Sequence, residues 1–424
     1  MVIATAGTAG RSDASTTNRM LPDTRVRIIG IEGIVPSLSL TVRSPKRIPG
    51  PTSVPPARPP KGTTVSIQPD DLATARDPLE NTHVDVLIVG AGPIGLETAA
   101  ELQRRGIKTL NLDRGPIGSQ VVDFPPGVRW FSGSERISIA GVPLETTTQE
   151  KATREDYLSY LRMVVGLFRL PVRTFESVES VTPADDPAGF TVETRTRSGL
   201  SRRIQARRIV MAIGGTARHR RLEIPGEDLP HVRHEVGEPH WGHGRRVLVV
   251  GGRNSAADSA IRLWRAGAKV TISYRGPEVH PRIKYWLRPE LASCVRSGLI
   301  EAKFGTVPTE ITAHGAVLKH IERGDREEVL ADDILMQIGY EADGSLFEAI
   351  GCRMDGEAMA VVHDEETMET SVPGIHVAGT AVAGTQGRFE VYIENSHIHA
   401  IRIAAAMSGE SPPATPVLPE LPES

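Results

Sequence analysis

The 424-residue sequence is poor in cysteine, with only Cys294 and Cys352, which lie 58 residues apart. Two such thiols cannot form a disulfide framework, and no Cys-x-x-Cys pair occurs anywhere. This usage makes a reducing cytoplasm the natural setting of the chain. We expect each cysteine to be a small core or surface thiol, and not a redox centre.

Long apolar runs, an excess of one charge and metal-ligand spacings are also missing. No stretch of about 18 apolar residues occurs, and no signal peptide is evident, so we expect no membrane span. The 49 basic and 52 acidic residues give a net charge of −3, without a basic stripe for nucleic acid. His397 and His399 are two residues apart and would point in different directions on a helix. We therefore expect structural histidines and no metal site.

A stretch of 31 residues, by contrast, occurs twice, at Val86–Pro116 and again at Val247–Pro277. The offset is 161 residues without a gap, and 12 of the 31 aligned positions are identical. Each copy has an apolar β-branched run, a glycine-rich turn, an amphipathic helix pattern and a second apolar run. This is the βαβ unit that binds a dinucleotide. Two copies predict two dinucleotides, and hence electron transfer between them.

The first copy carries a complete Gly-x-Gly-x-x-Gly fingerprint from Gly90 to Gly95. Its first glycine permits a tight turn, its second leaves room for a pyrophosphate, and its third lets helix and strand pack closely. The helix N-terminus offers unpaired N–H groups to the phosphates. An acidic residue 23 positions after Gly90 can accept both ribose hydroxyls. The candidate residues are Gly90, Gly92, Pro93, Gly95, Asp113 and its neighbour Arg114. The alternative is a glycine-rich turn in an ordinary α/β protein.

The second copy departs from the fingerprint at its middle glycine, which is Arg253. Gly251 keeps the first position, and Gly252 is the residue that would supply the room that Arg253 removes. The helix that follows starts with two polar residues that are candidates for coenzyme contacts, Asn254 and Ser255.

The second copy also lacks the acid. Tyr274 stands where the first copy has Asp113, and Arg275 follows it. Without the carboxylate there is no repulsion against a 2′-phosphate, and an arginine attracts one, which favours NADPH over NADH. Lys284 is a second candidate for that phosphate. The alternative for Arg275 is a solvated charge at a strand end, the role available to its counterpart Arg114.

Apolar runs outside the repeat indicate the remaining elements. Helices are expected over Leu96–Arg105, Asp156–Phe168 and Ser396–Met407. Strands are expected over Val84–Val89, Phe175–Val181, Phe190–Thr196, Arg207–Ile213, Ile334–Ile338 and Ile375–Ala378. The second βαβ unit thus lies between two parts of the first domain. The predicted fold class is α/β, with two Rossmann-like domains and a nicotinamide domain inserted into a split flavin domain.

We therefore divide the chain into five parts. Residues 1–82 form a Pro-rich extension, which we expect to be disordered, with the alternative of a short strand pair within Val26–Val42. Residues 83–217 and 334–410 form the two segments of the FAD domain, and 218–333 form the NAD(P)H domain. Residues 411–424 are a tail.

Several sequence blocks resemble the bacillithiol-disulfide reductase flavoproteins, a branch of the thioredoxin-reductase-like group. The resemblance covers about Val84 to Met407. It implies a homodimer that binds FAD in the split domain and NADPH in the inserted one, and a basic residue at the position of Arg253. The blocks are GAGPIGLETAAELQRRGI, FPPGVRWFSGSERISIAGVP, IPGEDLPHVRHE, VVGGRNSAADSA, TISYRGPEVHPRIKYW, VHDEETMETSVPGIHVAG and YIENSHIHA.

The chain departs from this group at two places. The cysteine proposed as catalytic in the family would stand at position 94, which here is Ile94. Thr380 replaces the Asp that many flavoproteins of this fold place against the flavin ribityl chain. The resemblance implies that Gly379 and Thr380 lie near the ribityl chain, and Gly214, which follows a strand, is a further candidate for the FAD site.

These observations predict an FAD-dependent oxidoreductase that passes hydride from NADPH to FAD and then to a disulfide or another small acceptor. The partner is a small molecule or a small redox protein, and no catalytic residue is assigned. The alternatives are a ferredoxin- or flavin-type NADP reductase, a flavin monooxygenase, and a non-catalytic protein that senses redox state.

Overall fold

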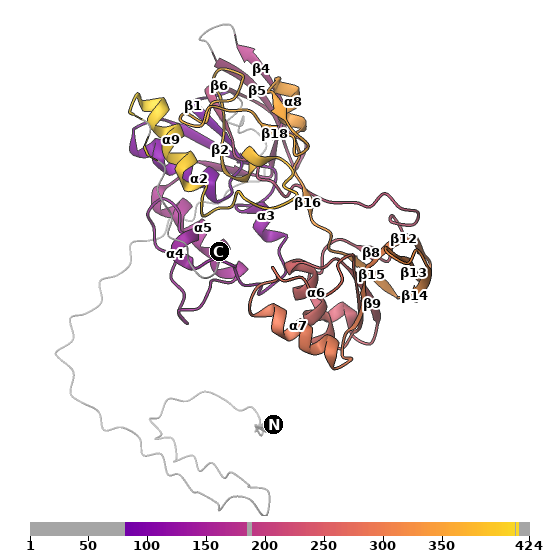
Figure 1. Ribbon diagram of the computed structural model, residues 1–424. Coiled ribbons are helices and arrows are strands. Elements are labelled where there is room, and N and C mark those ends of the chain that lie inside the picture. Colours follow the sequence, from indigo (N-terminus) through magenta and orange to yellow (C-terminus); the bar gives the residue numbers. More distant parts are fainter. Residues whose placement is uncertain (1–80, 185–188, 412, 415–424) are drawn as a thin grey trace, which may run out of the picture. The chain divides into compact units, whose positions relative to one another are not determined.

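The computed structural model describes residues 81–184, 189–411 and 413–414 (Figure 1). All described residues belong to one compact unit, which lies within residues 74–424. The predicted extension lies outside the described residues except for residues 81 and 82, and so does the alternative strand pair within Val26–Val42.

The two segments of the FAD domain share one seven-stranded sheet, in the order β3-β2-β1-β6-β5-β4, with β19 pairing β6. Strands β1, β2, β3, β6 and β19 run parallel, whereas β4, β5 and β6 form an antiparallel meander. The strands are β1 (Asn81–Val89), β2 (Thr109–Asp113), β3 (Val172–Thr174), β4 (Glu176–Ala184), β5 (Gly189–Thr196), β6 (Ser201–Met211) and β19 (Ile375–Val377).

Strand β6 connects the two segments because its two halves have different partners on one side. Its first half, from Ser201 to Ala206, pairs with β5, and its second half, from Ile209 to Met211, pairs with β19 of the second segment. Its other side pairs with β1 along nearly the whole length.

Two helices of this domain begin earlier than the apolar pattern predicts. Helix α2 (Pro93–Arg104) starts at Pro93, because proline fits the first helical turn, where no N–H partner is needed. Helix α5 (Arg154–Phe168) starts after a capping box in which Thr153 and Asp156 exchange hydrogen bonds. Helix α9 (His397–Ser408) packs beside α2 (Figure 1). The shorter helices are α3 (Ser119–Val122), α4 (Ser134–Ile137), α8 (Ser345–Ile350) and η2 (Gly379–Ala383).

The inserted domain contains a five-stranded sheet, β11-β10-β9-β15-β8, in which every pairing is parallel. A separate antiparallel sheet, β12-β13-β14, was not predicted. The elements are β8 (Val232–Arg233), η1 (Pro239–Gly242), β9 (Arg246–Val250), α6 (Asn254–Arg265), β10 (Lys269–Tyr274), α7 (Leu287–Arg296), β11 (Glu301–Phe304), β12 (Thr306–Thr312), β13 (Gly315–His320), β14 (Arg326–Leu330) and β15 (Asp333–Met336).

One predicted boundary is wrong. The strand from Ile334 was assigned to the second FAD segment, but β15 pairs with β9 and β8 of the inserted sheet. An apolar run carries no signal for which of two sheets it joins. The connections between the domains are instead β7 (Arg218–His219) and β16 (Tyr340–Glu341), which pair antiparallel. After them, β17 (Met354–Asp355) pairs with β18 (Ala360–Val361).

Candidate dinucleotide sites

The first fingerprint forms the turn between β1 and α2, and its three glycines have different surroundings. Gly90 has φ +116°, and a Cβ there would lie 2.3 Å from the Ala212 carbonyl oxygen at the end of β6. A Cβ on Gly95 would lie 2.4 Å from the Gly90 oxygen, whereas one on Gly92 would meet nothing within 4 Å. Folding therefore requires glycine at Gly90 and Gly95, and the open space at Gly92 fits a pyrophosphate.

Asp113 ends β2 and is buried next to this turn. Its carboxylate accepts hydrogen bonds from the Ala91 and Gly115 N–H groups, both at 2.8 Å. A carboxylate has about four acceptor positions, so two remain for ribose hydroxyls. Arg114, in contrast, is exposed. Asp113 thus both ties the strand end to the glycine turn and fits the predicted ribose role.

Of the remaining FAD candidates, Gly379 lies against the start of the same helix, whereas Thr380 lies near the segment after β6 and Gly214 lies near α3. Gly379 has φ +71°, and a Cβ there would lie 3.3 Å from the Ile94 Cβ. Thr380 adjoins the segment after β6, since its carbonyl oxygen would lie 3.2 Å from a Cβ on Gly215. Gly214 has φ +77°, and a Cβ on Gly214 would lie 2.3 Å from the Gln120 side-chain amide. The structure thus brings together residues that are far apart in the sequence.

Hydrogen bonds decide which groups near Gly379 are available to a cofactor. The Gly379 N–H donates to Nδ1 of His399 at 3.2 Å, so it is already used within the protein. Burial lowers the pKa of His399 to about 4, which keeps the ring neutral and able to accept this bond. The Thr380 hydroxyl makes no hydrogen bond with the described residues, so it is the group here that can bind the ribityl chain.

The second fingerprint reproduces the first close approach. Gly251 has φ +140°, and a Cβ there would lie 2.3 Å from the Gln337 carbonyl oxygen at the end of β15. The expected room at Gly252 is absent, because the Tyr274 ring lies 2.0 Å from the position of a Cβ there. Asn254 begins α6, and its side-chain oxygen accepts a hydrogen bond from the backbone N–H of Lys284 at 2.8 Å. Ser255, in the same turn, is exposed.

Basic side chains gather around this second turn. His280 contacts the Tyr274 ring edge-on, with centroids 6.2 Å apart. Burial lowers the pKa of His280, and so do the positive charges of three nearby arginines. These three arginines are exposed, namely Arg253, Arg282 and Arg288. A fourth exposed arginine, Arg275, directly follows Tyr274. None of the four pairs with a carboxylate of the described residues, so they are available to a coenzyme phosphate.

Two of these arginines, Arg282 and Arg288, were missed by the sequence analysis, and Lys284 was chosen in their region. The Lys284 ammonium instead donates to the Arg129 carbonyl oxygen of the FAD domain at 3.0 Å and lies over the Trp286 ring. Burial lowers the pKa of Lys284 to about 8. The sequence signal for these residues was the set of basic residues in the loop after the second strand of the repeat. Their spacing alone could not show which of them face the coenzyme.

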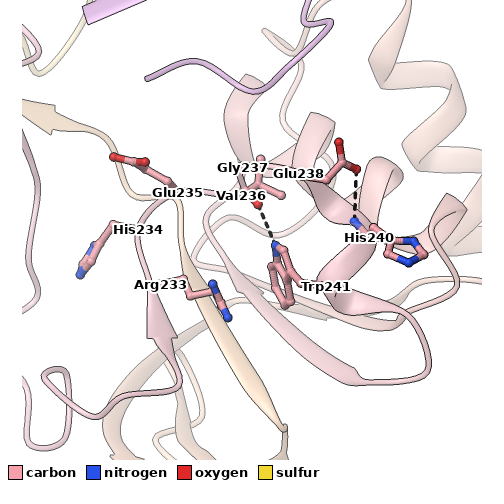
Figure 2. A pocket seen from close by; sticks show the side chains of 8 residues that line it. All are labelled: Arg233, His234, Glu235, Val236, Gly237, Glu238, His240 and Trp241. Carbon is pink, nitrogen blue, oxygen red and sulfur yellow. Dashed lines mark hydrogen bonds between the residues drawn. The ribbon is translucent and has the colours of Figure 1, made fainter. Parts of the chain in front are cut away.

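A pocket that the sequence did not indicate follows β8 at the carboxyl edge of the inserted sheet. It is lined by residues 233–238, 240 and 241, with His234 and Glu235 at one side and Trp241 at the other (Figure 2). The Trp241 indole donates to the Val236 carbonyl at 2.7 Å, and the Gln337 amide donates to the His234 carbonyl at 2.7 Å. Ligands of open α/β sheets bind at this edge, where the strand order reverses, here between β9 and β15.

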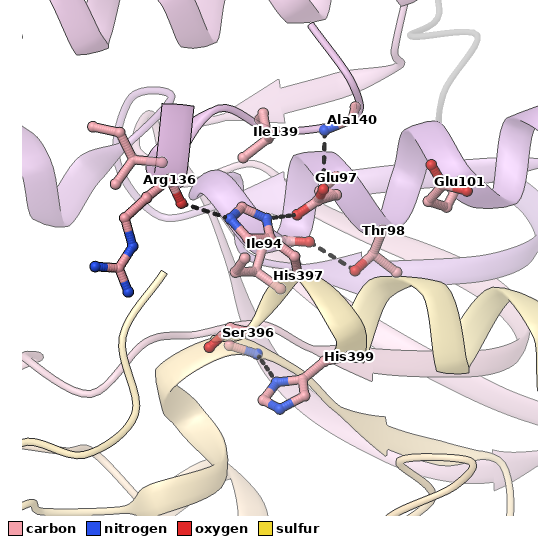
Figure 3. A network of polar contacts seen from close by, with 12 residues as sticks. Ile94, Glu97, Thr98, Glu101, Arg136, Ile139, Ala140, Ser396, His397 and His399 are labelled. Atoms are coloured by element: carbon pink, nitrogen blue, oxygen red, sulfur yellow. Dashed lines mark hydrogen bonds and ion pairs between the residues drawn. The ribbon is translucent and has the colours of Figure 1, made fainter. Parts of the chain in front are cut away.

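The last polar group of interest lies within the FAD domain. His397 at the start of α9 bonds to Glu97 of α2, and the two side chains are shown with their neighbours in Figure 3. His397 and His399 therefore both have protein partners. Among residues 81–184, 189–411 and 413–414, no cluster of three or more His, Cys, Asp or Glu side chains is placed to hold a metal ion. Nor is any helix of this part long and apolar enough to cross a membrane.

Comparison with known proteins identifies the class to which these two sites belong. The family model for pyridine nucleotide-disulphide oxidoreductases matches residues 87–379, and the chain belongs to this family. Bacilliredoxin reductase Bdr of Bacillus subtilis is 35% identical over 76% of this chain and 97% of its own. The solved bacillithiol disulfide reductase Bdr of Bacillus cereus has a TM-score of 0.73 at 35% identity, covering 77% of this chain and 99% of that one. A ferredoxin–NADP reductase of Ignicoccus hospitalis is 29% identical over 70% of this chain and 89% of its own.

The predicted resemblance and fold class are thus confirmed. The protein is an FAD-dependent NAD(P)H oxidoreductase with two Rossmann-like domains, and its cofactors are FAD and NADPH. When bound, these cofactors supply hydride transfer between nicotinamide and flavin, and the protein supplies position and electrostatics. The open cradle at Gly92, the donor at Thr380 and the unpaired arginines around Tyr274 fit these two groups.

The glycine geometry predicts that two neighbouring substitutions have different effects. Gly90→Ala forces a side chain against the Ala212 carbonyl at positive φ, so we expect the free energy of unfolding to fall by about 1–3 kcal/mol. Gly92→Ala enters open space, so the apoprotein keeps its stability while the dissociation constant for FAD rises about tenfold, or about 1.4 kcal/mol. Thermal unfolding of both apoproteins and FAD titration measure this. Equal losses of stability in the two variants would contradict the assignment.

The basic group predicts a selective effect on the coenzyme. Arg275→Ala should raise the apparent KM for NADPH about tenfold, through loss of about 1.5 kcal/mol from a charged hydrogen bond, and leave that for NADH unchanged. Arg114→Ala, the matched position of the first repeat, should change neither. Steady-state kinetics with both nucleotides and an artificial acceptor test this. Equal effects of Arg275→Ala on NADH and NADPH would show that Arg275 does not bind the 2′-phosphate.

Proposed function

We propose that the protein delivers electrons from NADPH, through FAD, to an acceptor that takes them at the flavin without a thiol of this chain. The observation that carries this proposal is the environment of Ile94. This side chain is 6% exposed and packs against Gly379 beside the FAD cradle. An isoleucine has no nucleophilic or redox-active group, so it cannot take part in thiol–disulfide exchange.

The two cysteines of the chain support the same conclusion. Cys352 is buried in the apolar core of the FAD domain, with its Sγ 3.5 Å from the Thr370 hydroxyl. Cys294 lies on α7, in the core of the inserted domain. Burial raises the pKa of both thiols, which disfavours the thiolate that disulfide exchange needs. Each cysteine therefore has the environment of a structural thiol.

The residues of this chain then have binding and positioning roles. Gly92 and the first turn of α2 hold the FAD pyrophosphate, Asp113 its ribose, and Thr380 the ribityl chain. Gly251 keeps α6 close to β15, and Arg275 with the neighbouring arginines binds the NADPH phosphates. In this proposal Lys284 binds no phosphate, because its amine is directed to Arg129.

The acceptor is a small molecule or a small redox protein. The name of the Ignicoccus hospitalis relative favours an electron carrier such as ferredoxin, which needs no enzyme thiol. The second candidate is a disulfide, favoured by the name of the Bacillus cereus relative, a bacillithiol disulfide reductase. Direct reduction of such a disulfide at the flavin would also avoid position 94. A screen of disulfides, quinones and ferredoxin for NADPH-dependent reduction identifies the acceptor, and peroxide release in its absence indicates oxygen chemistry instead.

We also propose a cytoplasmic homodimer, for which the support is the low cysteine content and the resemblance to a dimeric family. Sedimentation of the FAD-loaded protein at micromolar concentration should give a mass near twice 45.8 kDa. A single species at the protomer mass would contradict this part of the proposal.

Four proteins test the role of thiols together. We expect the wild-type chain to oxidise NADPH poorly with bacillithiol disulfide, and Cys294→Ser and Cys352→Ser to behave as the wild type does. Ile94→Cys should gain activity, because it places a thiol next to Gly379 and the FAD cradle. Robust wild-type turnover that disappears in either Cys→Ser variant would refute the proposal and identify that cysteine as the redox thiol.

A further inference from the structure

Helix α2, which begins at the FAD cradle, carries a buried carboxylate. Glu97 is 6% exposed, and its two oxygens have separate partners within the FAD domain. Oε1 accepts from the Ala140 N–H at 3.0 Å, and Oε2 contacts Nδ1 of His397 at 2.6 Å (Figure 3). Burying a carboxylate costs free energy unless it is paired and hydrogen-bonded. Glu97 therefore needs His397 in order to occupy its buried position on α2.

The surroundings of His397 determine its protonation. Its Nδ1 faces the Glu97 carboxylate, and its Nε2 lies 2.9 Å from the Arg136 carbonyl oxygen. Both partners accept hydrogen bonds, and a neutral imidazole has only one N–H to donate. With Glu97 ionised, both bonds can therefore be made only by the imidazolium. Burial by itself lowers the pKa of His397, but the hydrogen bond and charge of Glu97 and the Arg136 carbonyl outweigh it and raise that pKa above 6.5.

Other ionisable groups face this pair. Glu394, just before α9, raises the pKa of His397 further. His399, on the same helix, is held neutral by burial, with a pKa of about 4. From α5, Tyr157 and Tyr160 approach Glu97, and burial raises the pKa of both phenols, so they stay neutral while a histidine titrates. Within this set, His397 is the group that loses its charge as the pH rises through its raised pKa.

The pair holds together the two parts of the FAD site. Glu97 lies one helical turn after Ile94, in the helix whose N-terminus receives the pyrophosphate. His397 begins α9, which also carries His399, the acceptor for the Gly379 N–H next to Thr380. This buried ion pair is thus one of the contacts, together with the β6–β19 pairing, that join the first segment of the split domain to the second.

We propose that His397 is a positioning residue for FAD: its ion pair with Glu97 sets α9 and the Gly379–Thr380 turn against the cradle of α2, so that FAD affinity depends on one proton. A group whose pKa is raised on folding contributes its full stabilisation of the folded state below its unfolded pKa. This contribution is lost as the pH rises through the folded pKa. FAD should therefore be held more tightly below the raised pKa of His397 than above it.

The test is the dissociation constant of FAD between about pH 6 and about pH 9, followed by the fluorescence of released FAD. For the wild type we expect a rise of about tenfold across this range, beyond which the loss levels off. His397→Gln, a neutral substitute, should bind FAD weakly at every pH. His397→Lys keeps a positive charge across the whole range, so it should bind FAD tightly with a flat profile.

Glu101→Gln is the matched control, because Glu101 lies four residues further on α2 and pairs with Arg104 and Arg105 nearer the surface. It should keep the wild-type profile. A flat wild-type profile, or a His397→Lys profile that still rises with pH, would overturn the proposal. If His397→Gln fails to fold, as judged by circular dichroism of the apoprotein, the comparison of wild type with His397→Lys decides alone. The test uses only FAD binding, so its outcome is independent of the electron acceptor.

Discussion

The structure depends on one close approach that is made twice. In each domain the first glycine of the turn lies so near a carbonyl oxygen of the adjacent parallel strand that a Cβ would come within 2.3 Å of it. In the FAD domain the pair is Gly90 and Ala212, and in the inserted domain it is Gly251 and Gln337. The approach places each helix N-terminus at the edge where the strand order reverses, and every cofactor contact that we assign lies near one of these two points.

The two copies have diverged in what they do beyond this constraint. In the first, the middle glycine is open and an aspartate ties the strand end to the turn. In the second, the Tyr274 ring covers Gly252 and arginines surround the turn. The same backbone geometry thus accepts two dinucleotides, and the side chain at the end of the second strand distinguishes the environments. A carboxylate suits free ribose hydroxyls, whereas arginines suit an added phosphate.

Local features of the fold could be predicted well from the sequence. The repeat located β1, α2 and β2 and their counterparts β9, α6 and β10, because apolar periodicity and glycine spacing are short-range signals. The order of segments along the chain also predicted the insertion. The helix starts were displaced by a few residues, since Pro93 and the Thr153 cap precede the first apolar positions.

Features that depend on long-range placement could not be predicted. The sheet that β15 joins, the covering of Gly252 by Tyr274 and the direction of the Lys284 side chain each depend on which residues meet in space. The same holds for Glu97 and His397, which are 300 positions apart in the sequence. For His397 the sequence indicated only a structural histidine, because no local pattern identifies a partner so distant along the chain.

The divided pairing of β6 has a consequence for how the chain is made. One half of this strand pairs with β5, which is synthesised just before it, but the other half pairs with β19, which follows the entire inserted domain. Domains generally fold as units while a chain emerges from the ribosome. The inserted domain is contiguous, so its sheet can close as soon as β15 is released. In the FAD domain, half of one edge of β6 stays unpaired until β19 has been synthesised. The cofactor site of this domain is therefore the last part of the described protein to be completed.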